Sequence, residues 1–523
     1  MALVNMFKSM PVEQYADRYP IAPDSYHNDI WRQQTALYET MWNIFSREVF
    51  DETITEKSSQ LKYPLGINIF AQACINHQSA LFGEFEDEAL AFRVKSENTD
   101  AQKVESALDK IWRDSGRNSI LLEGGLISQI LGGVVFRPAW HPVRKRVYMR
   151  MIAPDVFFPV WNPDDYHELY EVILAFVIDR QTAMWRYNVK LKPSSDSGSD
   201  LVLVQEHWTP NEYEVTVNGQ QAYWDRERHL PARGANTYID PVTQQGILPF
   251  EYFPKMRAGG FYGLPLGRDA VTLQNELNLR AADIGDAIQE ASHQYKFLTN
   301  RPKGTAGLER LSRTGLNDLG MAAPGRDAPE VQVIKGGDVP AQAGEWVQFL
   351  RDETRTATFN PAVAFGQDEG SQRSALTLSF RMWPLTQSVR TERGYWADSF
   401  NSLNRKAIIV AATRGGYDLY PRHAEYYTVP VWNPMMPRDR EGLVNEVVLR
   451  KTNNIISTRR AVELLEEKET AWIEQELAEI EKDKVKDMNR EIKVAQSSGP
   501  NQFGNKPGDS SKNAPKKTEM PDS

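Results

Sequence analysis

The sequence predicts an α+β fold that is mainly helical. In the first third of the chain, and again after residue 267, apolar residues recur every three or four positions, as they do on one face of a helix. Between these regions, from residue 134 to 217, short segments rich in β-branched and aromatic residues alternate with Pro, Asn and Gly. The chain has 523 residues, of which 41% are hydrophobic and 25% charged, and this is enough apolar material for about two to four domains.

The pattern predicts three helices before the β-rich region and six strands within it. Helices are expected at residues 29–50, 66–82 and 101–115. The paired glycines at 124–125 and 132–133 then mark the change from a helical pattern to a β-strand pattern. Strands that pair antiparallel are expected at 134–140, 146–152, 156–161, 169–179, 201–209 and 212–217.

Helical periodicity returns at residue 267. Residues 267–293 carry one apolar stripe along a helix of about 25 residues, or about 38 Å. The Gly- and Pro-rich segment 297–340 reads as a small inserted module, with a helix candidate at 307–313 and a strand at 330–334. A second helix is expected at 341–358.

A loop and a very long helix follow. The loop, 359–373, contains a proline, two glycines and the acidic pair Asp368-Glu369, and Ser374 is a candidate N-cap. The next helix is expected to run to residue 416 with one kink at Pro384, because proline removes a backbone donor and clashes with the preceding turn.

The end of the chain changes from helical to polar. A helix is expected at 439–451, followed by a charged helix over 459–494 that Ser457 or Thr458 would cap. Residues 495–523 contain almost no apolar side chains, so they are expected to be disordered.

Composition excludes several classes of protein. The net charge of −9 argues against a protein that coats nucleic acid, because such binding depends on clustered Lys and Arg. A single cysteine, Cys74, excludes an intrachain disulfide framework and a multi-cysteine metal site. No apolar run approaches the roughly 20 residues that span a bilayer, so no membrane partner is expected. Residues 1–10 contain one Lys and no long apolar segment, so no secretory signal is expected.

Catalytic motifs are weak throughout the sequence. No Gly-Lys-Ser/Thr occurs, which excludes a Walker A phosphate loop. His167-Glu168 begins like a zinc-protease motif, but the second histidine is missing. The acid pairs Asp164-Asp165 and Asp368-Glu369 are more often solvated than catalytic. We therefore expect no enzyme activity, no catalytic residue, no metal and no cofactor.

Four segments, taken in order, resemble one family. Residues 68–83 (NIFAQACINHQSALFG) end in Leu-aromatic-Gly. Residues 263–278 (GLPLGRDAVTLQNELN) lead from a Gly-rich turn into a helix with Asn275 and Asn278 at polar positions. A loop before a long helix is the feature that residues 360–378 (NPAVAFGQDEGSQRSALTL) share with this family. An Ile-Ser entry into a Glu-rich helix is the feature shared by residues 454–481 (NIISTRRAVELLEEKETAWIEQELAEIE). Over roughly residues 61–486 the chain resembles the portal proteins of tailed bacteriophages.

This resemblance implies a ring at one capsid vertex through which double-stranded DNA is pumped. It also implies the portal fold, with a β-rich wing, a helical stem, a small α/β clip, a long kinked helix and a helical crown. The corresponding residues are 1–266 for the wing, 267–296 and 341–358 for the stem helices, 297–340 for the clip, 359–373 for the tunnel loop, 374–416 for the long helix, 417–494 for the crown and 495–523 for the tail.

The resemblance also assigns roles to individual residues. The tunnel-loop residues expected to face DNA are Asp368, Glu369, Gln372 and Arg373. The expected subunit interface on the stem comprises Leu273, Leu277, Ile284, Ile288, Trp346 and Phe349. Docking at the clip is expected through Arg310, Arg313, Asn317, Val331 and Val333, and Pro384 is expected to kink the long helix.

The implied partners are further copies of the chain in a dodecamer, the large terminase of the packaging motor, head-tail connector proteins, major capsid and scaffolding proteins, and DNA held without sequence preference. The implied location is the portal vertex of the virion, after synthesis in the host cytoplasm. Two alternatives stay open: a metal-dependent nucleic-acid enzyme that uses Asp164 and Asp165, and another capsid or adaptor protein with similar helices.

Overall fold

The computed structural model describes residues 25–46, 66–85, 88–95, 101–191, 200–240, 243–292, 295–299, 330–334, 341–367, 375–415, 426–435, 440–466 and 470–497. The fold is mixed α+β, as the sequence predicts. The chain divides into two compact units, Met1–Pro437 and Arg438–Ser523. Among the described residues, no helix is both long and apolar enough to cross a membrane.

The β-rich region of the first unit forms two antiparallel sheets, and each of the six predicted strands is present. In the smaller sheet, β2 (Gly133–His141) lies between β3 (Arg146–Ile152) and β12 (Glu251–Pro254). The larger sheet has the order β11-β7-β6-β5-β4, with β8 beside β7. Its strands are β4 (Phe157–Trp161), β5 (Leu169–Asp179), β6 (Leu201–Trp208), β7 (Glu212–Val217), β8 (Gln220–Gln221) and β11 (Arg233–Ala235).

Helices and short strands complete this unit. The predicted early helices are α2 (Ser25–Ser46), α4 (Ile69–Phe82) and α5 (Ala101–Asp114). Two small sheets pair β9 (Trp224–Asp225) with β10 (Leu230–Pro231) and β1 (Ala91–Lys95) with β15 (Tyr427–Val431). The sequence analysis did not predict β1, β12, β15 or the short helix α7 (Arg180–Tyr187).

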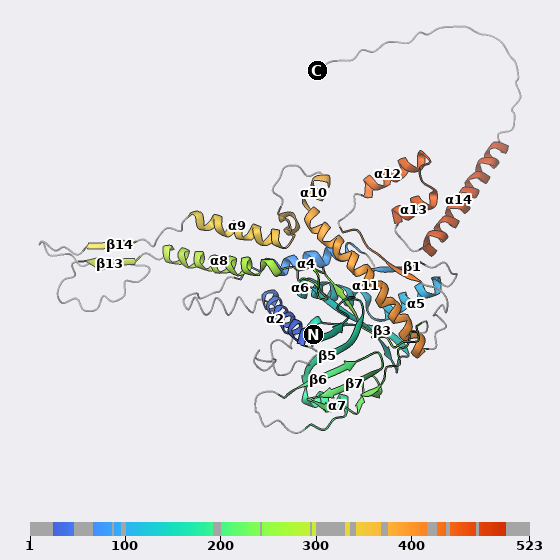
Figure 1. Ribbon diagram of the computed structural model, residues 1–523. Helices are drawn as coiled ribbons and strands as arrows, with labels where there is room; N and C mark the ends of the chain where they lie inside the picture. The colour runs from blue at the N-terminus through green and yellow to red at the C-terminus, as the bar shows by residue number, and fades with distance from the viewer. Residues whose placement is uncertain are drawn as a thin grey trace, which may run out of the picture. The chain divides into compact units, whose positions relative to one another are not determined.

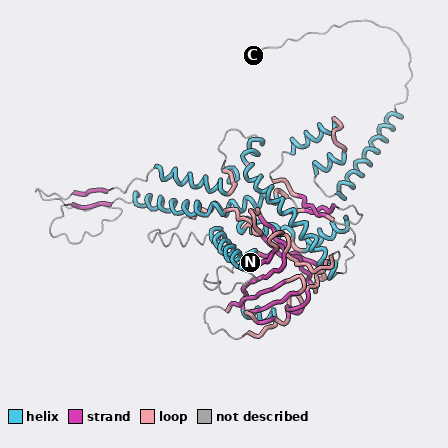
Figure 2. Tube along the Cα trace, in the orientation of Figure 1, coloured by secondary structure: helices cyan, strands magenta, loops and turns pink. Residues whose placement is uncertain are grey.

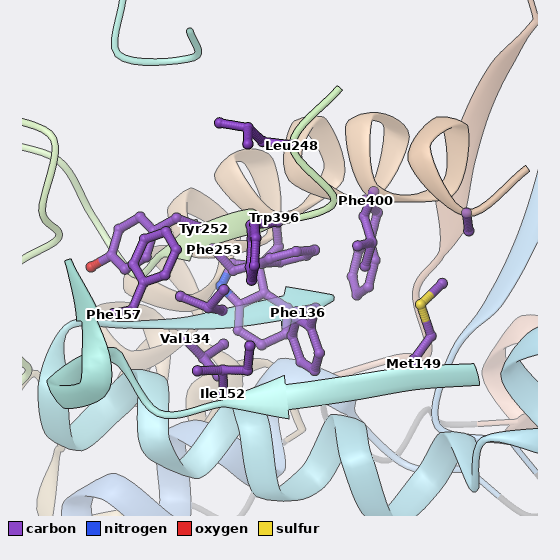
Figure 3. Packing of buried hydrophobic residues seen from close by; sticks show 14 of the residues in the cluster. Val134, Phe136, Met149, Ile152, Phe157, Leu248, Tyr252, Phe253, Trp396 and Phe400 are labelled. Carbon is purple, nitrogen blue, oxygen red and sulfur yellow. The ribbon is translucent and has the colours of Figure 1, made fainter. Parts of the chain in front are cut away.

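The main core lies where α11 (Trp383–Gly415) packs on the three-stranded sheet. Trp396 and Phe400 point from this helix towards the strands that carry Phe136 and Phe253 (Figure 3), and all four side chains are completely buried. The Phe253 ring centroid lies 4.8 Å from that of Phe400 and 4.9 Å from that of Phe136, in edge-to-face contacts that favour aromatic pairs.

A buried polar group also ties α11 to its neighbours. The Glu392 carboxylate accepts hydrogen bonds from Gln129 Nε2 (2.7 Å) and Ser128 Oγ (3.2 Å), and it lies 3.5 Å from Lys255 Nζ. Burial raises the pKa of Glu392, although these donors and the Lys255 charge oppose the rise. Ser128 and Gln129 belong to α6 (Arg117–Leu131), and Lys255 directly follows β12, so these contacts fix α11 against both elements.

The sequence analysis missed α6, because it treated Gly124-Gly125 as a break. Both glycines lie inside the helix, where each makes room for an aromatic ring. A Cβ atom on Gly124 would lie 2.6 Å from the Phe136 ring, and one on Gly125 would lie 2.6 Å from the Phe82 ring. Here glycine permits close packing rather than ending the helix.

The predicted long helix is interrupted near Pro384. The interruption is a break between two helices and not the predicted kink within one helix. A first helix, α10 (Ala375–Arg381), is separated from α11 by Met382, and the two run in different directions (Figure 1). Pro384 is the second residue of α11, in the first turn, where the missing N–H has little cost.

The helix pair α8 (Val271–Ser292) and α9 (Ala341–Ala357) projects from the sheets, with the two helices side by side (Figures 1 and 2). In the chain they flank β13 (Tyr295–Thr299) and β14 (Glu330–Ile334), which pair antiparallel. The strand predicted at 330–334 is therefore confirmed, and its partner β13 was missed.

The second unit is helical, with α12 (Arg440–Thr452), α13 (Thr458–Glu466) and α14 (Thr470–Ser497). Ser457 caps α13, because its Oγ accepts a hydrogen bond from the Arg460 N–H at 3.2 Å. The prediction of one charged helix over 459–494 is wrong, since two helices occupy this range. α14 also covers the first three residues of the predicted disordered tail, and 498–523 lie outside the described residues.

Candidate stem interface and channel loop

Two buried side-chain amides fix the base of α8 to the start of α4. Gln274 Oε1 accepts hydrogen bonds from the N–H groups of Ile69 (3.0 Å) and Phe70 (3.3 Å), and Gln274 Nε2 donates to the Ile67 carbonyl (2.6 Å). Asn278 Oδ1 accepts from the Ile67 N–H (2.8 Å). Because the first N–H groups of a helix have no acceptor within it, α8 supplies part of the cap of α4.

Apolar contacts between α4, α8 and α9 hold the helix pair together. Leu277, Leu350 and Ile69 form a small buried cluster, against which Leu273 and Val347 pack. Leu277 is completely buried within the chain, so it stabilises the pair and presents no surface to another subunit. Leu273 is partly buried in the same contact.

Other predicted interface residues are left uncovered. The exposed fractions are 46% for Trp346, 49% for Phe349 and 56% for Ile288, while Ile284 is half-buried. The Trp346 and Phe349 rings stack on each other, with centroids 5.2 Å apart and planes at 21°. Large apolar side chains gathered on a projecting element are typical of a contact surface.

Buried polar side chains anchor the first half of the predicted tunnel loop. His77 Nε2 lies 3.1 Å from the carbonyl oxygen of Thr358, and Asn360 Nδ2 donates to the same oxygen at 2.7 Å. Asn76 Nδ2 donates to the Ala364 carbonyl at 3.1 Å. Burial, reinforced by the positive charge of Lys255, holds the pKa of His77 well below its ordinary value. The neutral imidazole therefore donates to a carbonyl that the end of α9 leaves without a helical partner.

Arg355 fixes this segment from the other side. Its guanidinium donates to Gln367 Oε1 (2.9 Å) and Asp352 Oδ1 (3.2 Å), and its Cζ lies 5.0 Å from the centroid of the Phe365 ring. The short 3-10 turn Ala362–Phe365 is thus held against α9 and α4. The sequence analysis named none of these anchors, because each pairs residues from elements far apart in the sequence or inside a presumed loop.

The loop tip itself lies outside the described residues, and with it Asp368, Glu369, Gln372 and Arg373. Its two flanks are described: Gln367 on one side and α10 on the other. Three large apolar side chains that the sequence analysis did not name are exposed at the α10–α11 break, namely Leu378, Phe380 and Trp383.

The predicted clip is described only in part. In the β13–β14 register, Val331 stands opposite Leu298 and Val333 opposite Lys296. The helix candidate at 307–313 lies outside the described residues, as do the predicted docking residues Arg310, Arg313 and Asn317.

The acid pair of the enzyme alternative lies in an exposed turn between β4 and β5. Asp165 Oδ1 accepts a hydrogen bond from the His167 N–H (2.9 Å), and the Asp164 N–H donates to Asn162 Oδ1 (3.0 Å), so both acids take part in the turn. Within the described part of the chain, no three His, Cys, Asp or Glu side chains are grouped so that they could hold a metal ion.

Comparisons with known proteins identify the family. The family described as "Phage portal protein, SPP1 Gp6-like" matches residues 88–490, which include the sheets, the α8–α9 pair, the segment 355–367 and most of the helices of the second unit. Among curated proteins, no match was found. Because the match covers most of the chain and includes three of the four segments that carry the resemblance, the chain belongs to the SPP1 Gp6-like family of phage portal proteins.

Proposed function

We propose that copies of this chain close into a ring at one capsid vertex, and that double-stranded DNA passes through the ring during packaging and ejection. The observation that carries the proposal is the α8–α9 pair, on which Trp346, Phe349 and Ile288 are about half exposed. The family match supports it, because the family is one of phage portal proteins. In a cyclic ring each subunit uses two different surfaces, one for each neighbour. A projecting pair of helices offers two such flanks, and the ring is a dodecamer.

The DNA-facing part of the proposal rests on the anchored flanks of residues 368–374. In the ring, Asp368, Glu369, Gln372 and Arg373 face the channel. The acidic residues repel phosphate and the Arg contacts it only briefly, so the duplex slides instead of being retained. The net charge of −9 supports a channel that does not bind DNA tightly. Pro384 sets the direction in which α10 leaves α11 and hence the place of the loop.

The remaining partners follow from the family plan. Residues 297–340 dock first the large terminase and later a head-tail connector protein, through Arg310, Arg313, Asn317, Val331 and Val333. Major capsid and scaffolding proteins hold the ring in the vertex of the virion. The protein acts as a structural conduit and docking platform, in keeping with a family that is generally not enzymatic.

The test is an assembly measurement on the full chain. Wild-type protein is expected to sediment as one discrete large oligomer and to give rings with a central hole by electron microscopy. The double variant Trp346→Ser, Phe349→Ser is expected to sediment as a monomer, because the apolar area that drives association is lost.

The matched control is Trp185→Ser, which removes an aromatic side chain of similar exposure, 60%, from α7 on the wing. It should leave the rings intact. Rings of normal size from the double variant would show that the α8–α9 surface is not the subunit interface. A wild-type chain that stays monomeric at every salt and protein concentration would contradict the ring itself.

A further inference from the structure

A pocket of about 110 Å³ lies in the β-rich region, and four arginines from four different places in the chain line it. Arg137 comes from β2, Arg150 from β3, Arg228 from the turn before β10 and Arg414 from the end of α11. The rest of the wall is largely aromatic and includes Trp140, Tyr148, Trp208, Tyr213 and Tyr238. Nothing in the portal function requires such a pocket.

The carboxylates near the pocket balance only part of this charge. Glu206 is buried and pairs with Arg228 Nη2 and with Arg137 Nη1, the latter at 3.3 Å. Asp225 lies 3.3 Å from Arg228 Nε. Arg414 donates to a neutral acceptor, Thr237 Oγ1, at 2.5 Å.

Arg150 is half-buried, and among the described residues its guanidinium has neither an ion pair nor a hydrogen-bond acceptor. It stands opposite Arg137 in the β2–β3 register, where two like charges repel each other. Among the described residues, the four arginines of the pocket are therefore paired with two carboxylates, Glu206 and Asp225, and neither Arg150 nor Arg414 forms an ion pair.

Two donors inside the cluster also lack partners. Arg137 Nε and Arg228 Nη1 are buried and have no hydrogen-bond acceptor in the described part of the chain. Burial, together with repulsion from Arg228, lowers the pKa of Arg137 to about 10. A buried donor without an acceptor is costly, and native proteins usually satisfy such groups with protein, water or a bound ion.

We propose that this pocket binds a small oxyanion. Planar guanidinium groups match the oxygen geometry of phosphate and carboxylate, and they bind it through paired hydrogen bonds. The aromatic wall makes the surroundings of the pocket less polar than bulk solvent, so each of these contacts is stronger than it would be in water. The volume suits one oxyanion group, since a cavity of about 150 Å³ holds a single benzene molecule.

The oxyanion could come from free phosphate or from a carboxylate side chain. Titration calorimetry on the full-length protein distinguishes these two sources. Inorganic phosphate and acetate are titrated at constant ionic strength, with chloride as the reference anion. Saturable, one-to-one heat from either anion, absent with chloride, supports the proposal. Tighter binding of phosphate assigns the site to a free phosphate group, and tighter binding of acetate assigns it to a carboxylate.

Variants locate the site. Arg150→Gln and Arg414→Gln are each expected to weaken binding at least about tenfold, because each removes a charge-assisted hydrogen-bond donor. Arg144→Gln is the matched control, since it removes an exposed arginine from the turn that joins β2 and β3. It should bind as the wild type does.

Far-UV circular dichroism and sedimentation confirm that each variant folds and assembles like the wild type. Equal heats for phosphate, acetate and chloride would overturn the proposal. So would binding that both arginine variants retain in full while they stay folded. Neither result would bear on ring formation, which the sedimentation measurement reports separately.

Discussion

The core under α11 and the α8–α9 pair bury their large side chains in opposite ways. In the core, Phe136, Phe253 and Trp396 are completely enclosed by elements of the same chain. On the helix pair, Trp346 and Phe349 stack on each other and remain about half exposed. The difference separates two tasks: the core stabilises the single subunit, whereas the helix pair leaves apolar area that we propose is used for contacts between subunits.

Phe136→Ala tests the core half of this comparison and should have the largest effect. The ring contacts Phe253, Trp112 and Trp396, so its loss leaves a cavity that these neighbours fill only in part. The free energy of unfolding should fall by about 3–5 kcal/mol in a denaturant titration. Val143→Ala, in an exposed turn, is the control and should change it by less than about 0.5 kcal/mol. A loss below about 1 kcal/mol for Phe136→Ala would show that the core is loosely packed.

Glu206→Gln tests a charged part of the same unit. Burial by itself raises the pKa of Glu206, but the charges of Arg228 and Arg137 outweigh it and hold the pKa well below its ordinary value. The carboxylate therefore contributes stability above the unfolded-state pKa, and this contribution is lost as the pH falls towards the folded-state pKa. The variant leaves Arg137 without a carboxylate partner and Arg228 with Asp225 alone, and should cost about 3 kcal/mol at pH 7.

The same measurement at lower pH checks the sign. The wild type should lose stability from about pH 5 downwards, and the gap between wild type and variant should narrow over that range. Glu212→Gln, on an exposed carboxylate of β7, serves as the control and should leave both the stability and its pH dependence unchanged. A constant gap down to pH 3 would contradict the lowered pKa.

His77 makes the anchoring of residues 358–367, the start of the proposed tunnel loop, sensitive to a milder acid range. Because its folded-state pKa lies well below the unfolded value of about 6.5, the unfolded chain takes up the proton first. Stability from this group is complete above that value and falls as the pH drops below it, by at most about 1.4 kcal/mol per pH unit. In His77→Gln, urea titrations between pH 7 and 5 should show a flatter dependence. The exposed His167→Gln should keep the wild-type slope.

The strands were the part of the fold that the sequence predicted best. β3, β5 and β7 have the predicted bounds, since β-branched residues and turn residues are local signals. The pairing of β1 with β15 was missed because it joins residues more than 300 positions apart, and short apolar runs do not indicate their partners. Helix α6 was missed because a glycine pair signals a break unless the ring that needs the space is known.

The site was predicted less completely for a related reason. The apolar stripe of α8 is visible in the sequence and contains Ile288, while the resemblance named Trp346 and Phe349 on α9, and all three are exposed. The same stripe contains Leu277, which is buried against α4, because one face of α8 serves the chain itself. Which side of a stripe stays open depends on where α4 packs, and periodicity does not carry that information.

Two glycine-to-alanine substitutions test the comparison between the core and the helix pair most specifically, although their expected effects on stability are the smallest. Alanine is better than glycine within a helix by about 1 kcal/mol, so the intrinsic effect is the same at both positions. In α6, a Cβ on Gly124 would lie 2.6 Å from the Phe136 ring, which is itself enclosed. In α9, a Cβ on Gly344 meets no atom within 4 Å. Gly124→Ala should therefore lower the free energy of unfolding by about 1–2 kcal/mol despite the better helix former.

Gly344→Ala should instead stabilise α9 by up to about 1 kcal/mol, measured as slower amide hydrogen exchange along that helix. The opposite signs depend only on what surrounds each glycine, so they report directly on which helix is closely packed within the subunit. If Gly344→Ala also hindered ring assembly while it slowed exchange, the open space beside that glycine would be part of the subunit contact. If Gly124→Ala were stabilising, α6 would not be closely packed on β2, and the contrast between the two regions would not hold.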